Sequence, residues 1–177
     1  MDITIRQEFP ADYRTTEALV KRTFGEESYS DPTEDTLVHN LRESDAFIPE
    51  LSLVALDSGE HIIGHILLSR VSIEDGRAAV ESLAIAPVSV APERQNQGIG
   101  TQLMHAALHR AAEVGHSSVI VLGHPGYYAK FGFRQAEHWN IRAPFDVPEE
   151  AFMALELTEH ALDEVQGVVQ YSQPFLE

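Results

Sequence analysis

The chain contains no cysteine among its 177 residues. Disulfide bonds, a thiol nucleophile and a cysteine-ligated zinc site are therefore excluded. No apolar run is long enough to cross a bilayer, and residues 1–6 have the pattern of a strand rather than the basic and then apolar pattern of a secretion signal. We predict one domain over residues 1–177, located in the cytoplasm and without membrane contact.

Basic residues are scarce as well. The 12 Lys and Arg stand against 28 Asp and Glu, which gives a formal net charge of -16, and no Lys or Arg follows Arg142. Such an acidic surface repels nucleic acid and anionic lipid, so no nucleic-acid partner is expected. The same charge would attract cationic amines, but solubility or adaptation to a salty cytoplasm explains this composition better than substrate steering.

Hydrophobic periodicity predicts a mixed α/β sheet with helices on both faces. Helices are expected at residues 10–24, from residue 31 onward, at 97–114 and briefly around Tyr127. Strands are expected at residues 2–8, 51–57, 61–71, 79–90, 118–122, near 133, and at 151–157, with a last strand or a tail at 167–175. Turn residues at 57–60 and 75–77 indicate two hairpins, so the middle strands form an antiparallel meander.

The most informative segment is residues 90–101, where a strand ends, the chain turns and a helix begins. Gly98 and Gly100 lie at the helix opening, where the first N–H groups have no intrahelical partner. Two glycines there leave room for a phosphate or pyrophosphate at the positive end of the helix dipole. Neither a Walker loop nor a dinucleotide fingerprint fits, because Thr101 and Leu103 stand where the lysine and the third glycine would be. The alternative is a glycine-opened helix that binds nothing.

Residues 95–100, Gln-Asn-Gln-Gly-Ile-Gly, resemble the Q/R-x-x-G-x-G/A signature of the GNAT acetyltransferase superfamily, whose loop binds the pyrophosphate of coenzyme A. Residues 123–133 resemble the Y-x-x-x-G-F element that ends the GNAT core, with Tyr128 at the tyrosine position and Gly132 and Phe133 as the final pair. The order and spacing of the two motifs are similar too. The sequence around the tyrosines most resembles the YhbS-like branch of predicted acetyltransferases.

The resemblance implies a single GNAT domain whose sheet is largely antiparallel, with the fourth and fifth strands splayed at residues 87–90. Pro87 independently favours a break or bulge there, because proline cannot donate a ladder hydrogen bond. The exposed backbone would pair with the pantetheine arm of acetyl-CoA, and Arg94 would help to hold this anion. The implied cofactor-binding residues are Val88, Ser89, Val90, Gln95, Asn96, Gln97, Gly98, Ile99, Gly100, Thr101 and Phe131.

The resemblance also makes Tyr128 the candidate general acid that protonates the leaving thiolate, since a tyrosine of pKa about 10 suits that task. The alternative is that Tyr128 only packs before the glycine turn. Tyr127 has the same chemistry but is expected to project elsewhere and pack. In the family a carboxylate often stands eleven residues before the position of Gln95, and here that residue is Ala84.

The general base is therefore not identified. Glu81 is the nearest carboxylate on this strand, but it has the opposite parity to Ala84 and is expected to face the other side of the sheet unless a bulge redirects it. Deprotonation of the acceptor would then use ordered water or a group from elsewhere; the candidates are Glu26, Glu27 and His124. An acceptor amine that is already mostly neutral would need no strong base.

No metal site is expected. His105 and His109 have a metal-compatible spacing on the long helix, and His61 and His65 share a strand face, but neither pair has a third ligand and both are predicted to be solvated. The favoured function is transfer of an acetyl group from acetyl-CoA to a small amine or a protein amine by a monomer or homodimer. The alternatives are a non-catalytic module that senses acyl-CoA or binds a partner, and a different phosphate-binding enzyme such as a nucleotide hydrolase.

Overall fold

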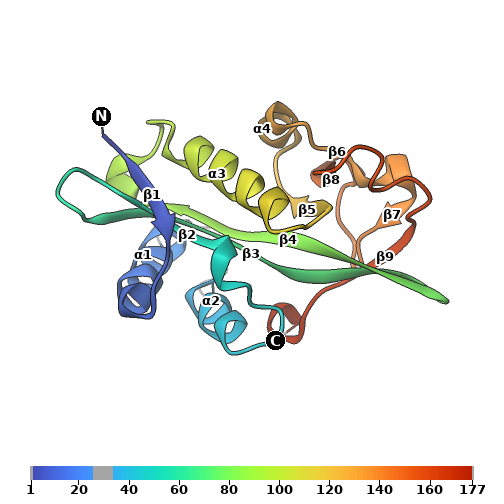
Figure 1. The fold of residues 1–177 in the computed structure, drawn as a ribbon, viewed down its shortest axis with the longest axis horizontal. Helices are drawn as coiled ribbons and strands as arrows, with labels where there is room; N and C mark the ends of the chain where they lie inside the picture. The colour runs from blue at the N-terminus through green and yellow to red at the C-terminus, as the bar shows by residue number, and fades with distance from the viewer. Residues whose placement is uncertain (1, 26–33, 177) are drawn as a thin grey trace.

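The computed structural model describes residues 2–25 and 34–176 and places a mixed sheet between two layers of helices (Figure 1). Helices α1 (Tyr13–Gly25) and α2 (Glu34–Arg42) lie on one face, and α3 (Ile99–Glu113) and α4 (Pro125–Tyr128) lie on the other. The predicted helices on both faces are therefore confirmed. None of the helices in the described ranges has the length and apolarity needed to cross a membrane.

The strands follow the order β1-β2-β3-β4-β5-β8-β6, and β9 joins the sheet beside β3 and pairs with β7. Only the β4–β5 and β7–β9 pairs are parallel, which confirms the predicted, largely antiparallel sheet. Strand β7 was not predicted, because two residues carry no periodic signal. The strands are β1 (Thr4–Gln7), β2 (Ser52–Leu56), β3 (Ile62–Asp75), β4 (Ala78–Val90), β5 (Ser118–Leu122), β6 (Arg134–Gln135), β7 (Ile141–Arg142), β8 (Phe152–Glu156) and β9 (Gly167–Gln170).

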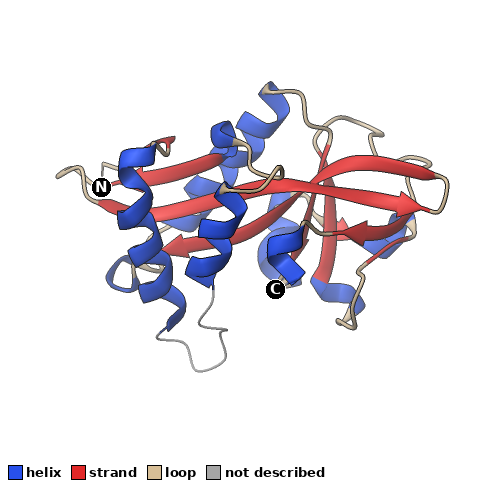
Figure 2. Ribbon diagram, turned by 90° about the horizontal axis from the view of Figure 1, so that it is seen from below, coloured by secondary structure: helices blue, strands red, loops and turns tan. Residues whose placement is uncertain are grey.

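Strand β3 extends four residues beyond its predicted end at Val71. This extension includes polar residues such as Ser72 and Glu74, which pair with β4 on one edge and with β9 on the other. Tertiary hydrogen bonding thus overrides the weak local strand signal. Together β3 and β4 form the long hairpin that runs across the molecule in both ribbon views (Figures 1 and 2).

The apolar side of α3 forms the largest core cluster against β2, β3 and β4. Leu103, Ala107 and Ala111 are buried at the predicted helical spacing. Val114 was predicted to continue this stripe but is 41% exposed, because the helix ends at Glu113 and Val114 is already the C-cap residue. A stripe limited to one face is sufficient to fix α3 on the sheet.

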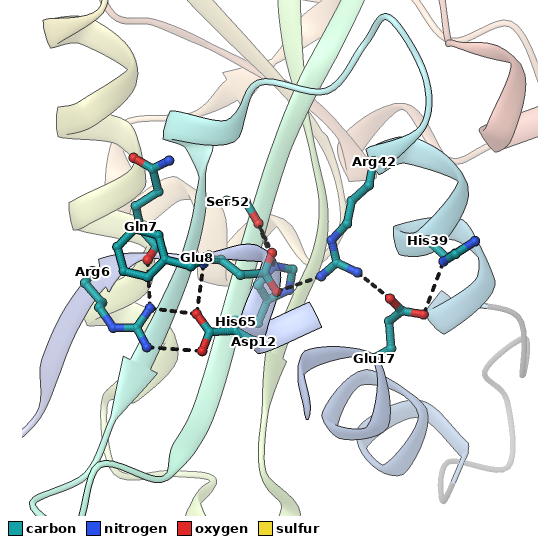
Figure 3. Close-up of polar contacts among 10 residues, drawn as sticks. Arg6, Gln7, Glu8, Asp12, Glu17, His39, Arg42, Ser52 and His65 are labelled. Carbon is teal, nitrogen blue, oxygen red and sulfur yellow. Dashed lines mark hydrogen bonds and ion pairs between the residues drawn. The ribbon is translucent and has the colours of Figure 1, made fainter. Parts of the chain in front are cut away.

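A buried polar network joins β1, β2 and β3 to the two helices below the sheet (Figure 3). The fully buried Glu8 carboxylate accepts hydrogen bonds from Ser52 Oγ at 2.7 Å and from Arg42 Nη2 at 2.6 Å. Arg42 Nη1 donates to Glu17 of α1 at 2.5 Å. His65 Nε2 lies 3.0 Å from Ser52 Oγ, and burial lowers the pKa of His65 to about 4, so this ring is neutral at physiological pH.

The position of His65 corrects the prediction of a solvated histidine face on β3. Its side chain is fully buried, whereas His61 lies before the strand begins and is exposed. The prediction failed because helices cover both faces of the sheet, so that every residue of β3 from 63 to 69 is buried whichever way it points. His105 and His109 are exposed on α3 as predicted.

We expect Arg42→Met to lower the free energy of unfolding by about 3–5 kcal/mol, because it leaves the buried Glu8 without its charged partner. Arg22→Met is the matched control: Arg22 forms an exposed 3.2 Å ion pair with Glu93, so its loss should cost about 1 kcal/mol or less. Urea unfolding followed by circular dichroism measures both. Equal stability of the two variants would contradict a stabilising role for the buried network.

Candidate functional site

The site begins where two parallel strands part. Leu83 and Ala84 of β4 pair with Val119 and Ile120 of β5, and no other residues of these two strands pair with each other. Strand β4 nevertheless continues to Val90, held on its other edge by β3. The predicted splaying of the fourth and fifth strands is thus confirmed. It leaves a β4 edge that can accept an extended ligand as a further strand.

An irregularity in β4 lies within this free edge. The register between β3 and β4 shifts between Ile66 and Leu68, opposite Ala86 and Pro87. Proline has no N–H group to donate to a ladder, so such a shift is the usual setting for it inside a sheet. The bulge predicted from Pro87 is therefore present. It separates the half of β4 that contains the residues paired with β5 from the half that borders the groove.

The opening of α3 faces the same space. Gly98 is the N-cap residue with φ of +81°, a left-handed conformation that favours glycine. Gly100 lies in the first turn, and a Cβ added there would lie 3.5 Å from Tyr127 Oη and 3.8 Å from Val90 Cγ2. The first N–H groups of α3 lack intrahelical partners. They form the cradle of backbone donors that the glycines predict.

The chain leading to this cradle is held by side chains from elsewhere. Gln95 Nε2 donates a hydrogen bond to the Val90 carbonyl at 3.2 Å. Thr23 Oγ1 of α1 lies 3.2 Å from the same oxygen and 2.8 Å from the Leu19 carbonyl, so its single proton is shared between the two acceptors. Arg94 Nη2 donates to Asp57 Oδ2 at 3.1 Å. The end of β4 and the start of the loop are therefore fixed from two sides before α3 begins.

These elements enclose a groove of about 670 Å³. Most residues predicted to bind the cofactor line it, and so does the predicted acid; they are Val88, Val90, Gln95, Asn96, Gly98, Ile99, Gly100, Thr101 and Tyr128. Four further lining residues are Thr23, Arg94, Tyr127 and Lys130. The groove thus brings together two motifs that lie about thirty residues apart in the sequence.

Three of the predicted cofactor-binding residues are not part of the groove wall. Ser89 alternates to the opposite side of β4 and is buried opposite His65. Gln97 is exposed on the loop. The ring of Phe131 packs edge-on against His105 at 5.0 Å and Tyr127 at 5.4 Å between ring centres.

Tyr128 is held in place by aromatic neighbours and by a glycine. Its ring centre lies 5.0 Å from that of Tyr127 and 5.8 Å from that of Phe133. A Cβ added to Gly123 would lie only 2.4 Å from the Tyr128 ring, so this position requires glycine. Burial, together with the neighbouring Tyr127, raises the pKa of Tyr128 to about 12. The phenol therefore stays protonated at neutral pH, and it is a weaker acid than a free tyrosine.

Sequence reasoning missed Gly123 and the groove-facing position of Tyr127. Helix α4 has a single turn, and both of its adjacent tyrosines line the groove, whereas the sequence pattern predicted only Tyr128 there. The pair of adjacent tyrosines in the sequence was the signal that could have predicted this. Thr23 gave no signal, since its contact with Val90 depends on how α1 packs against the sheet.

Within the described residues, the structure identifies no general base. Ala84 is buried in an apolar cluster that includes Ile120 and Phe152. Glu81 is exposed on the paired half of β4 and lies 3.5 Å from Arg70. The candidates Glu26 and Glu27 lie outside the described residues, and His124 is exposed at the N-cap of α4. No Asp or Glu is among the described residues that line the groove.

Residues 12–133 match the acetyltransferase (GNAT) family. The uncharacterized N-acetyltransferase YhbS of Escherichia coli (strain K12) is 34% identical over 171 residues, 97% of this chain and 97% of YhbS. A crystal structure of Escherichia coli YhbS in complex with CoA superposes with a TM-score of 0.87 at 33% identity, covering 99% of this chain and 92% of that one. A GNAT family acetyltransferase from Brucella melitensis in complex with acetyl-CoA superposes with a TM-score of 0.80 at 31% identity, covering 98% of both chains.

We expect Gly123→Ala to destabilise the fold by about 1–3 kcal/mol, because the new methyl group overlaps the Tyr128 ring and forces it to move. Gly126→Ala is the matched control, since a Cβ at Gly126 meets no atom within 4 Å. Urea unfolding measures the difference. Equal stability of the two variants would mean that Tyr128 is not confined by Gly123.

Proposed function

The chain belongs to the acetyltransferase (GNAT) family, and we propose that it is an N-acetyltransferase that moves the acetyl group of acetyl-CoA directly onto an amine. One observation carries the proposal. A single groove joins the free half of β4, the glycine opening of α3 and the side chain of Tyr128. In the proposal, the strand edge binds the extended arm of the thioester, the opening of α3 binds the diphosphate, and Tyr128 supplies the acid.

The residues fit this donor in charge and in shape. The N–H groups at the opening of α3 suit the diphosphate, and the absence of a side chain at Gly100 lets it approach the backbone. The groove wall contains two cations, Arg94 and Lys130, within a chain of net charge -16. The free edge between Ile85 and Val90 offers backbone groups to the amides of the pantetheine arm.

In the proposed reaction the amine nitrogen attacks the thioester carbonyl carbon, forming the C–N bond and an oxyanion. Collapse of the oxyanion breaks the C–S bond, and the electron pair leaves with the sulfur. The Tyr128 hydroxyl donates a proton to that sulfur, and the proton lost by the amine reaches the resulting phenolate through water. Orienting the two reactants and supplying this proton are the tasks left to the protein.

We further propose that the acceptor is a small amine or a protein amine, neutral or cationic, and neither a nucleic acid nor an acidic protein. The net charge of -16 opposes the approach of polyanions and favours that of cations. The site has no carboxylate at the position of Ala84. This favours acceptors with a substantial neutral fraction at the assay pH, since they need no strong base.

To test the function, free thiol release from acetyl-CoA is measured against amines, polyamines, aminoglycosides and amino acids at two ionic strengths. We expect turnover with neutral or cationic amines, and rates with cations that fall as salt is added. Saturable binding of acetyl-CoA without thiol release for any member of the panel would instead support a non-catalytic acyl-CoA sensor. Turnover confined to anionic acceptors would overturn the electrostatic argument.

We expect Tyr128→Phe to lower turnover by about 10²-fold or more, with little change in the affinity for acetyl-CoA, since it removes one general acid. Because the pKa of Tyr128 is raised to about 12, its proton is present below that pH and is lost only above it. The pH–rate profiles of wild type and variant should therefore have the same shape between about pH 6 and 10 and differ in height. Full turnover by the variant with a competent acceptor would make Tyr128 a packing residue.

A further inference from the structure

We propose that Tyr127 and Lys130 form a phosphate-binding wall opposite the opening of α3, so that the two adjacent tyrosines have different tasks: Tyr127 holds the donor and Tyr128 protonates its sulfur. This inference rests on the proposed function, because it assigns residues to the acetyl-CoA groove. It differs from the sequence-based expectation, in which Tyr127 projects away and only packs.

The position of the Tyr127 hydroxyl is the first observation. Tyr127 Oη lies 3.5 Å from the point where a Cβ on Gly100 would stand, so it is in van der Waals contact with the first turn of α3 and closes one side of the cradle. A diphosphate held by the N–H groups of that turn would lie beside the phenol, within reach of its hydroxyl. A phenolic O–H is a hydrogen-bond donor, and a donor facing an anion forms one of the stronger hydrogen bonds in proteins.

Lys130 supplies a positive charge on the same side. Its Nζ lies 4.6 Å from the centre of the Tyr127 ring, and both residues line the groove. Only two lysines occur in the whole chain, Lys21 and Lys130. A lysine stacked on the tyrosine whose hydroxyl meets the cradle adds an ammonium group to the side of the groove formed by α4 and the residues after it.

The geometry of the short helix separates the roles of the two tyrosines. Tyr127 and Lys130 are three residues apart and therefore lie on the same side of a helical turn, whereas Tyr128 points about 100° away. The Tyr128 ring is enclosed by Gly123 and Phe133. Tyr127 instead packs beside Phe131 and keeps its hydroxyl toward Gly100. One tyrosine thus faces the phosphate cradle, and the other is set against the end of β5.

The experiment compares Tyr127→Phe, Lys130→Gln and Gly100→Val, with Lys21→Gln as the matched lysine control. Calorimetry with CoA and with dephospho-CoA measures binding, and acetyl transfer from S-acetyl-pantetheine, which carries no phosphate, measures the chemistry alone. We expect Tyr127→Phe to weaken CoA binding by about 10-fold or more, and to raise the KM for acetyl-CoA by a larger factor than it lowers kcat. Lys130→Gln should weaken CoA binding by about 3-fold at low salt and less as salt is added.

The effects of both variants should vanish with S-acetyl-pantetheine, and Lys21→Gln should behave as wild type throughout. If a variant also binds dephospho-CoA more weakly than wild type does, its contact is with the diphosphate. If the loss of affinity is seen with CoA but not with dephospho-CoA, the contact is with the ribose phosphate. Either result supports the wall. Unchanged CoA affinity in Tyr127→Phe, or a loss of turnover equal for both acetyl donors, would overturn it. If Gly100→Val also binds CoA normally, the proposed cofactor cradle itself fails, and this outcome is separate from failure at Tyr127 alone.

Discussion

The site depends on one constraint, which is that parallel pairing between β4 and β5 stops after Leu83 and Ala84. An unpaired backbone group inside a protein costs free energy unless it finds a partner. A gap in the middle of a sheet therefore has to be filled by water or by a ligand. Here β4 continues for six residues beyond Ala84 without pairing with β5, and it presents that edge to a groove instead of to a neighbouring strand.

The buried network on the opposite face of the sheet contributes to this geometry. Arg42, the last residue of α2, donates hydrogen bonds to Glu8, which directly follows β1, and to Glu17 of α1. The same helix α1 carries Thr23, whose hydroxyl contacts the Val90 carbonyl at the end of β4. The position of α1 therefore affects the loop that begins α3. Groups remote from the groove hold its wall, and they do so through charge-assisted hydrogen bonds that require one orientation.

Features that depend on local pattern could be predicted from the sequence. The buried stripe of α3, with Leu103 and Ala107, follows from the helical spacing of apolar residues. The glycine opening of α3 follows from the backbone freedom of glycine, and the bulge near Pro87 follows from the N–H group that proline lacks. Features that depend on packing could not. His65 is buried because helices cover both faces of the sheet around β3, and the crowding at Gly123 arises because the short helix α4 folds the ring of Tyr128 back onto it. Two-residue strands such as β7 form only when a neighbour completes them.

The protein and the proposed donor carry charge of the same sign, so capture of the donor has to be local. Screening limits the repulsion, since exposed charges farther apart than about 8 Å interact weakly at physiological ionic strength. Within the groove, Arg94 already pairs with Asp57, so a phosphate would have to compete with that carboxylate. The N–H groups at the opening of α3 have no such competitor among the described groove-lining residues, because these include no acid. Their partial charges come from the aligned peptide dipoles and do not titrate. Under the proposed function, binding in so acidic a chain depends on backbone geometry, and glycine at positions 98 and 100 leaves the approach to the backbone open where a basic side chain would block it.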